Sequence, residues 1–306
     1  MNPTNLKFQA IRTFLATVEA GSIRAAARRL NLTQPAISKA LKGLEDDLGV
    51  SLFTRGTKGI ELTDFGRAFQ ERSITILNEV ESAVAEIKQM RGELDSHVQI
   101  SVSPAAAIQI APRAIRNFRR EFPNTTIRIF EALQTMAVKQ LRSAEIDLAL
   151  VPIYTPLSNK EFISTPLVDI QMRIICRKGH PLEKSTHLHQ LSEAEWVHVS
   201  SGAEHAPLIS QLFAKHHLKV PKVGIDCFSL LSSVSIVQNT DCLCLLPEVM
   251  LGQPQFPSEH FTVINTAEAP SINRIYLVQR RDKPLTPVAQ KLANHLLRFT
   301  ELGQNG

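Results

Sequence analysis

The sequence predicts a multidomain α+β protein, with an N-terminal winged helix-turn-helix, then one long helix, then a C-terminal α/β region. Three patterns lead to this prediction. Two short amphipathic helices precede a glycine-containing hairpin within residues 1–63, apolar residues recur at heptad-like spacing over 64–91, and strands alternate with helices from residue 98 onward. The chain has 306 residues, 43% of them hydrophobic, which is enough for two or three domains with sizeable cores.

Residues 23–42 carry the helix-turn-helix pattern. Ser22 and Thr33 are favourable N-caps for the two helices. Asn31 tolerates the left-handed conformation that ends a helix, and Pro35 suits a first helical turn. An ordinary helical hairpin with a solvated polar face would show the same periodicity, and the wing predicted after it favours DNA binding. The apolar faces are formed by Ile23, Ala26, Ala27 and Leu30, and by Ile37, Leu41, Leu44 and Leu48.

The polar face of the second helix favours DNA binding. It offers amide, hydroxyl and ammonium groups, which suit base edges and phosphates in a major groove. Residues 52–63 read as two short strands around a glycine-containing turn, which predicts a wing that brings cations to DNA beside that helix. We predict base readout by Gln34 and Ser38. The full set of predicted DNA contacts is Arg24, Thr33, Gln34, Pro35, Ser38, Lys39, Lys42, Arg55 and Lys58.

The excess positive charge lies in the same region. Residues 1–62 hold nine basic and five acidic residues, whereas the rest of the chain holds 25 and 24. Most of the net charge of +5 is therefore concentrated where the helix-turn-helix is predicted. Phosphate binding with release of counterions needs such a concentration of cations.

Residues 6–63 resemble the DNA-binding domain of LysR-type transcriptional regulators. The matching segments are 14–22 (FLATVEAGS), 25–26 (AA), 32–38 (LTQPAIS), 44–45 (LE), 48–49 (LG), 52–53 (LF) and 62–63 (LT). Several matches in a fixed order are far more specific than a lone helix-turn-helix, and the family pattern covers the rest of the chain less sharply. The resemblance implies a regulator that binds double-stranded DNA and a small-molecule effector, acts with RNA polymerase and forms a homotetramer.

Residues 64–91 predict a long helix with an apolar stripe. Such a stripe can pack on its own domain or against a second copy of the helix, and heptad-like spacing favours the second copy. In the resembling family the equivalent linker helix pairs two DNA-binding domains. We therefore predict an operator with dyad symmetry. The predicted dimer interface consists of Phe69, Ile76, Val80, Ala83 and Ile87.

The α/β region follows from residue 92 to residue 306. Predicted strands are 98–102, 126–130, 146–151, 173–176, 196–199, 223–227, 243–246 and 275–279, and predicted helices lie near 114–118, 136–141, 205–217, 229–238 and 288–299. The resemblance implies an effector-binding domain with two α/β lobes, like periplasmic solute-binding proteins. It places lobe I at about 96–160 plus 269–303 and lobe II at about 161–268. The chain would cross between the lobes near 154–162 and 266–271.

Ligands of two-lobed α/β domains bind where strand ends and helix N-termini meet. Small hydroxyl residues at those ends can donate to a ligand or can simply cap their own helices. These strand ends and helix starts contain no arginine that could clamp a carboxylate, and several of their residues are apolar. We therefore predict that the effector is a small organic anion with an apolar or aromatic body. The candidate effector-binding residues are Ser103, Pro104, Ala105, Gln134, Thr135, Pro152, Ser200, Ser201, Gly202, Phe228 and Ser229.

Several function classes find no support in the sequence. It contains no HExxH, GxSxG, P-loop or GxGxxG pattern, and its four cysteines form no CxxC pair, so we expect no enzyme, cofactor or metal site. No secretory signal and no apolar run of about 20 residues is found, so we expect a cytoplasmic protein without membrane contact. The cysteines read as buried thiols. A redox-responsive or effector-independent regulator is the alternative, and a solute-binding protein would have no use for a basic helix-turn-helix.

Overall fold

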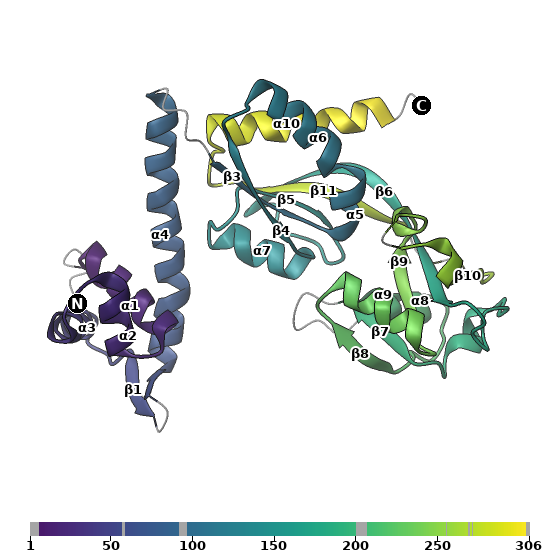
Figure 1. Ribbon diagram of the computed structural model, residues 1–306, viewed down its shortest axis with the longest axis horizontal. Coiled ribbons are helices and arrows are strands. Elements are labelled where there is room, and N and C mark those ends of the chain that lie inside the picture. Colours follow the sequence, from purple (N-terminus) through teal and green to yellow (C-terminus); the bar gives the residue numbers. More distant parts are fainter. Residues whose placement is uncertain are drawn as a thin grey trace. The chain divides into compact units, whose positions relative to one another are not determined.

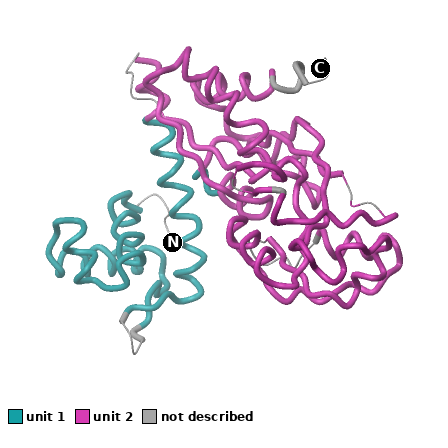
Figure 2. Tube along the Cα trace, turned by 45° about the vertical axis from the view of Figure 1, so that its right-hand side comes forward, with its two compact units in different colours: residues 1–84, 143–145 teal, residues 85–142, 146–306 magenta. Residues whose placement is uncertain are grey.

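The computed structural model describes residues 6–56, 59–91, 97–199, 207–254, 256–268, 270 and 272–303. It divides into two compact units, residues 1–84 with 143–145 and residues 85–142 with 146–306 (Figure 2). Helices and one hairpin make up the first unit, and an α/β region makes up most of the second (Figure 1). The predicted fold class is confirmed. No helix in these ranges is long and apolar enough to cross a membrane.

The N-terminal helices begin and end where local side chains dictate. Their bounds are α1 (Phe8–Ala20), α2 (Ile23–Leu30) and α3 (Gln34–Leu48). The Ser22 hydroxyl accepts a hydrogen bond from the Ala25 N–H at 3.2 Å, and the Thr33 hydroxyl accepts one from the Ala36 N–H at 3.3 Å. Asn31 ends α2 with a φ of 53°. Both predicted N-caps and the left-handed turn residue are confirmed.

The core of the first unit forms around Phe14. This side chain is fully buried, and its ring lies 5.2 Å from the ring centroids of both Phe53 and Phe69. The core thereby joins α1 to the wing and to the long helix. Its other buried members are Leu15, Ala27, Ile37, Leu41, Leu44 and Leu52.

The wing and the long helix continue directly from α3. Strands β1 (Phe53–Gly56) and β2 (Gly59–Leu62) pair antiparallel, and helix α4 runs over Asp64–Met90. A Glu45 carboxylate oxygen accepts hydrogen bonds from the backbone N–H groups of Leu52 at 2.7 Å and Phe53 at 3.2 Å, which anchors the wing to α3. The Thr63 hydroxyl accepts from the Gly66 N–H at 3.0 Å and so caps α4.

The second unit is built on a mixed sheet with the strand order β4-β3-β5-β11-β6-β9-β7-β8, and β10 pairs with β6. The strands are β3 (His97–Val102), β4 (Thr126–Glu131), β5 (Leu148–Pro152), β6 (Phe162–Arg177), β7 (Trp196–Val199), β8 (Val223–Cys227), β9 (Leu243–Pro247), β10 (Phe261–Ile264) and β11 (Ile272–Arg280). The helices are α5 (Pro104–Gln109), α6 (Ala111–Glu121), α7 (Gln134–Arg142), α8 (Pro207–Lys215), α9 (Leu230–Asn239) and α10 (Pro287–Gly303).

Strand β6 belongs to both lobes. From Phe162 to Gln171 it pairs with β11, and from Met172 onward it pairs with β9 and β10. We define lobe I as β3, β4, β5, β11 and the first part of β6 with α5, α6, α7 and α10, and lobe II as the remaining strands with α8 and α9. The first crossing thus lies inside β6 near Met172, and its predicted position at 154–162 is wrong. The return connection lies between β10 and β11.

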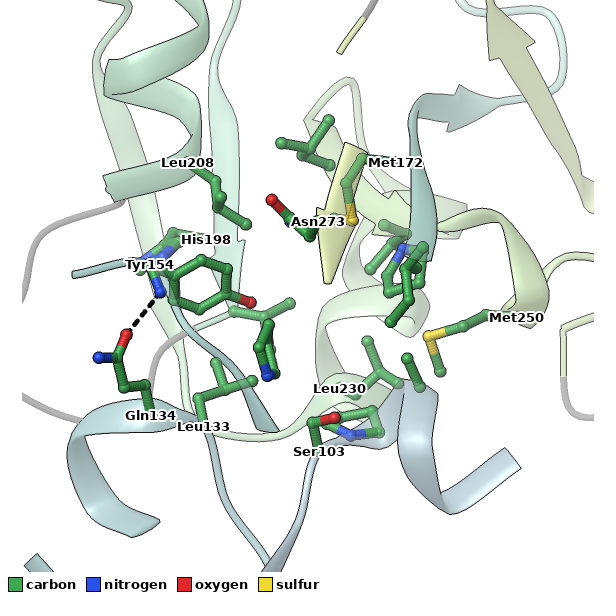
Figure 3. A pocket seen from close by; sticks show the side chains of 18 of the residues that line it. Ser103, Leu133, Gln134, Tyr154, Met172, His198, Leu208, Leu230, Met250 and Asn273 are labelled. Carbon is green, nitrogen blue, oxygen red and sulfur yellow. Dashed lines mark hydrogen bonds between the residues drawn. The ribbon is translucent and has the colours of Figure 1, made fainter. Parts of the chain in front are cut away.

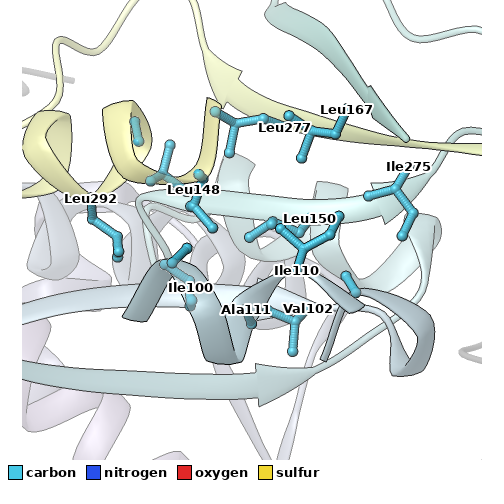
Figure 4. Packing of buried hydrophobic residues seen from close by; sticks show 14 of the residues in the cluster. Ile100, Val102, Ile110, Ala111, Leu148, Leu150, Leu167, Ile275, Leu277 and Leu292 are labelled. Atoms are coloured by element: carbon cyan, nitrogen blue, oxygen red, sulfur yellow. The ribbon is translucent and has the colours of Figure 1, made fainter. Parts of the chain in front are cut away.

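Each lobe has apolar side chains on both faces of its strands. In lobe I, one cluster packs α5, α6 and α10 onto the sheet and includes Ile100, Leu148 and Leu292 (Figure 4). A second cluster lies under α7. In lobe II, one cluster surrounds the fully buried Trp196 and a second lies under α9. Burial on both faces explains the near-continuous apolar runs of the parallel strands.

Candidate functional site

Helix α3 presents the predicted polar face to solvent. Gln34, Pro35, Ser38, Lys39 and Lys42 are all exposed, whereas Ile37 and Leu41 on the same helix are buried. Thr33 and Arg24 are exposed as well. The helix therefore separates an inward apolar stripe from outward amide, hydroxyl and ammonium groups, which is the division that a recognition helix needs. Direct DNA contact by these residues stays a prediction.

The two cations predicted in the wing lie partly or wholly outside the described structure. Arg55 is placed in β1 opposite Ile60, but its side chain is not described, and Lys58 lies outside the described residues. In the described part of the first unit, ion pairs join Arg29 to Glu19 and Arg67 to Asp64. Phosphate contact by the wing therefore stays a prediction.

Helix α4 carries a row of exposed apolar side chains. Ile76, Val80, Ala83 and Ile87 all face solvent in the single chain, and the exposed fraction of Ile87 reaches 58%. Phe69 differs from them, because it is half-buried and packs edge-on against Phe14. The ring of Phe69 therefore contributes to the core of its own unit, and its part in a dimer interface stays a prediction.

A cavity of about 80 Å³ lies between the lobes of the second unit. Lobe I contributes the ends of β3 and β5 and the starts of α5 and α7, and lobe II contributes β7, β9 and the start of α8. Strand ends converge there because β3 and β5 run parallel, as do β7 and β9. A volume several times that of a single water-sized sphere gives room for a small organic molecule.

The structure brings together six of the eleven predicted effector-binding residues. Ser103, Pro104, Ala105, Gln134, Thr135 and Pro152 line the cavity. Ser200, Ser201 and Gly202 lie outside the described residues. Phe228 and Ser229 are absent from the lining of this cavity, and effector contact by them stays a prediction. Phe228 turns to solvent with 71% of its surface exposed, and the Ser229 hydroxyl caps α9 by accepting from the Ser232 N–H.

Two of the lining residues are engaged in holding the fold. The Ser103 hydroxyl accepts from the Ala106 N–H at 3.4 Å and caps α5. The Gln134 amide oxygen accepts from the N–H groups of Tyr154 and Thr155, and its NH₂ donates to the Thr155 carbonyl oxygen at 2.6 Å. Gln134 therefore positions the segment after β5, and we assign it a structural role at the wall of the cavity.

Three polar lining residues were not among the predicted ones: Tyr154, His198 and Asn273. The hydroxyl of Tyr154 points away from Gln134 toward the middle of the cavity (Figure 3). Burial raises the pKa of Tyr154 above its ordinary value, so the phenol stays protonated. The Nδ1 of His198 lies 3.2 Å from a carboxylate oxygen of Asp226. Tyr154 shortly follows a predicted strand. The rule that ligands bind beyond the ends of strands could therefore have located it from the sequence.

Burial lowers the reactivity of two of the four cysteines. Cys176, Cys242 and Cys244 are buried, Cys227 is half-buried, and all four are free thiols. Burial raises the pKa of Cys176 to about 11 and that of Cys244 to about 12, which keeps these thiols protonated and poorly nucleophilic. Within the described ranges, no group of three His, Cys, Asp or Glu side chains is placed to hold a metal ion.

Comparisons with known proteins agree with this arrangement. Residues 91–301 match the LysR substrate binding domain, and residues 8–67 match the bacterial regulatory helix-turn-helix protein, lysR family. The uncharacterized HTH-type transcriptional regulator YbhD of Escherichia coli K12 is 26% identical over 93% of this chain and 89% of its own. The HTH-type transcriptional regulator TdcA from the same organism is 25% identical over 86% and 83%.

A solved structure shows the same fold over nearly the whole chain. Full-length CbnR, determined in complex with its target DNA, superposes with a TM-score of 0.70 at 18% identity and covers 96% of this chain and 100% of that one. The family match of the C-terminal region alone spans more than half of the present chain. Together with the helix-turn-helix, its wing and the two-lobed domain, these matches show that the chain belongs to the LysR family of DNA-binding transcriptional regulators.

Proposed function

We propose that this chain regulates transcription by binding an operator with dyad symmetry and that a small organic effector in the inter-lobe cavity switches its operator binding or its promoter activation. The observation that carries the proposal is a cavity lined from both lobes, in a chain whose helix α3 exposes a polar face. A ligand that touches both lobes favours one arrangement of them, and it shifts that equilibrium only by its differential affinity for the two states.

Self-association is part of the proposal. The apolar stripe of α4 is proposed to pair two chains, and contacts between effector domains would complete a tetramer. Pairing places two copies of α3 on two half-sites of the operator. An activating complex would further contact RNA polymerase.

Replacing Gln34 by Ala is expected to remove about 1–3 kcal/mol of discrimination at one base position, because an amide on the groove-facing side of α3 can bond an adenine edge with both of its groups. A competition binding assay measures this loss of base discrimination. It compares operator fragments that carry every substitution at each position. Gln9→Ala removes an exposed amide from α1 and serves as the matched control. If Gln34→Ala weakens specific and random DNA equally, Gln34 contacts only the backbone.

Filling the cavity is expected to abolish ligand binding. A thermal-shift screen of the full chain against small organic compounds should give hits that stabilise by about 2.7 kcal/mol at a hundredfold excess over Kd. Leu208 is half-buried and lines the cavity, so Leu208→Trp should lose the shift. Leu231→Trp enlarges an exposed side chain of the same lobe outside the cavity and should keep it. Hits that shift both variants equally would place the ligand elsewhere.

A further inference from the structure

The wall of the inter-lobe cavity is mainly apolar. Its apolar side chains come from both lobes and include Ile170, Met172, Val197, Leu208 and Leu245. Among the described lining residues there is no lysine, arginine, aspartate or glutamate. An ionised carboxylate would enter this space with its hydration lost and no permanent cation to replace it, which is unfavourable.

His198 is the one described lining residue that can acquire a positive charge. Its Nδ1 lies 3.2 Å from an Asp226 carboxylate oxygen, and only 11% of the His198 side chain is exposed. When the imidazole ring is protonated, the carboxylate beside it balances its charge. The pair therefore adds no net positive charge to the cavity and gives an anionic ligand little compensation for desolvation.

The polar groups that face the cavity suit a neutral ligand. The hydroxyl of Ser103 and the amide of Gln134 already bond to backbone groups. Within the described residues, no bond joins the hydroxyl of Tyr154 or the side-chain amide of Asn273 to a protein group. Both side chains point into the space between the lobes (Figure 3). Tyr154 belongs to lobe I, and β11, which carries Asn273, starts where the chain returns to that lobe.

We propose that the effector of this protein is an uncharged, mainly apolar molecule with a carbonyl or hydroxyl group that bonds to Tyr154 and Asn273. This inference rests on the proposed function, and it replaces the organic anion expected from the sequence. The hydroxyl of Tyr154 donates to a ligand oxygen, and the amide of Asn273 can donate or accept. The apolar walls from lobes I and II enclose the rest of the molecule, so its burial favours the arrangement in which the lobes lie together.

Matched pairs of compounds test the proposal. Methyl benzoate and benzoate, and methyl 1-naphthoate and 1-naphthoate, share a skeleton and differ in charge at neutral pH. Titration of the full-length protein by calorimetry should show each ester binding at least about tenfold more tightly than its carboxylate. A carboxylate that binds as tightly as its ester overturns the proposal. So does the absence of binding by both esters up to low millimolar concentration.

Two variants locate the preference in the cavity. Tyr154→Phe should weaken ester binding about three- to tenfold because one hydrogen bond is lost. Asn273→Lys places an ammonium group in the wall and should strengthen carboxylate binding at least about tenfold. Asn294→Lys makes the same charge change on the exposed side of α10 and should leave both affinities as in the wild type. Equal carboxylate affinities in the two lysine variants would overturn the assignment.

An operator footprint separates this proposal from the proposed function. Footprints are recorded with and without saturating ester. Esters that bind selectively and alter the footprint support both the uncharged ligand class and the effector switch. Esters that bind selectively without altering it support the ligand class and count against the effector switch. A protein that binds no operator at all refutes the proposed function, whatever the calorimetry shows.

Discussion

Val80→Asp is expected to leave each chain folded and to prevent pairing through α4. The Val80 side chain is 41% exposed in the single chain, so a carboxylate there stays hydrated. In a paired helix it would be buried against an apolar partner, and an unpaired buried carboxylate costs several kcal/mol. Sedimentation equilibrium at low micromolar concentration should show smaller species, and operator affinity should fall because two half-sites are no longer bound together.

Two control variants accompany Val80→Asp. Val80→Ala keeps an apolar side chain at the same position and should retain the parent mass. Lys88→Glu changes charge on the same helix at an exposed position outside the stripe and should also retain it. A Val80→Asp protein with the parent mass would show that the stripe does not form the interface.

Gly66→Ala is expected to destabilise the junction of the wing and α4. A Cβ at this position would lie 2.1 Å from the backbone carbonyl oxygen of Leu52 and 2.8 Å from a methyl carbon of Leu62. The carbonyl cannot rotate away as a side chain could, so the backbone must shift, at a cost of about 1–3 kcal/mol or more. The midpoint of urea-induced unfolding of the N-terminal unit should fall.

Gly43→Ala is the matched control for this variant. Gly43 lies in the interior of α3, and a Cβ there would meet nothing within 4 Å. Alanine favours the helix by about 0.8–1.0 kcal/mol over glycine, so the unfolding midpoint should rise. Two midpoints that move in the same direction would mean that the close approach at Gly66 is relieved without cost.

The N-terminal unit was predictable because local chemistry determines it. Caps at Ser22 and Thr33, the left-handed Asn31 and the apolar spacing of α2 and α3 act within a few residues of one another. The first part of β6 was missed for a local reason as well. Pro166 interrupts the strand pattern, and the pairing register with β11 shifts beside it, between Ile275 and Tyr276. A proline within a run argues against a strand, and here the irregularity accommodates it.

The cavity could be predicted only in part. Strand ends and helix starts indicated Ser103, Gln134 and Pro152, because that rule follows from topology. The rule cannot tell which polar side chain bonds to the ligand and which to the protein. Gln134 bonds to the segment after β5, whereas Asn273 reaches the cavity only because β11 returns beside β6. Contacts between residues so far apart in sequence have no local signal.

The shared strand β6 determines how the lobes can move. It continues from one lobe into the other without a loop, and next to the crossing β11 pairs with β6 alone, from Arg274 opposite Asp169 to Ile272 opposite Gln171. Across this ladder the Arg274 guanidinium donates to the Asp169 carboxylate and lowers the pKa of that group. A two-stranded ribbon twists and bends easily but resists sliding, because sliding breaks its ladder of hydrogen bonds. We therefore expect the joint to twist rather than slide, so that ligand binding produces a small rotation of one lobe against the other.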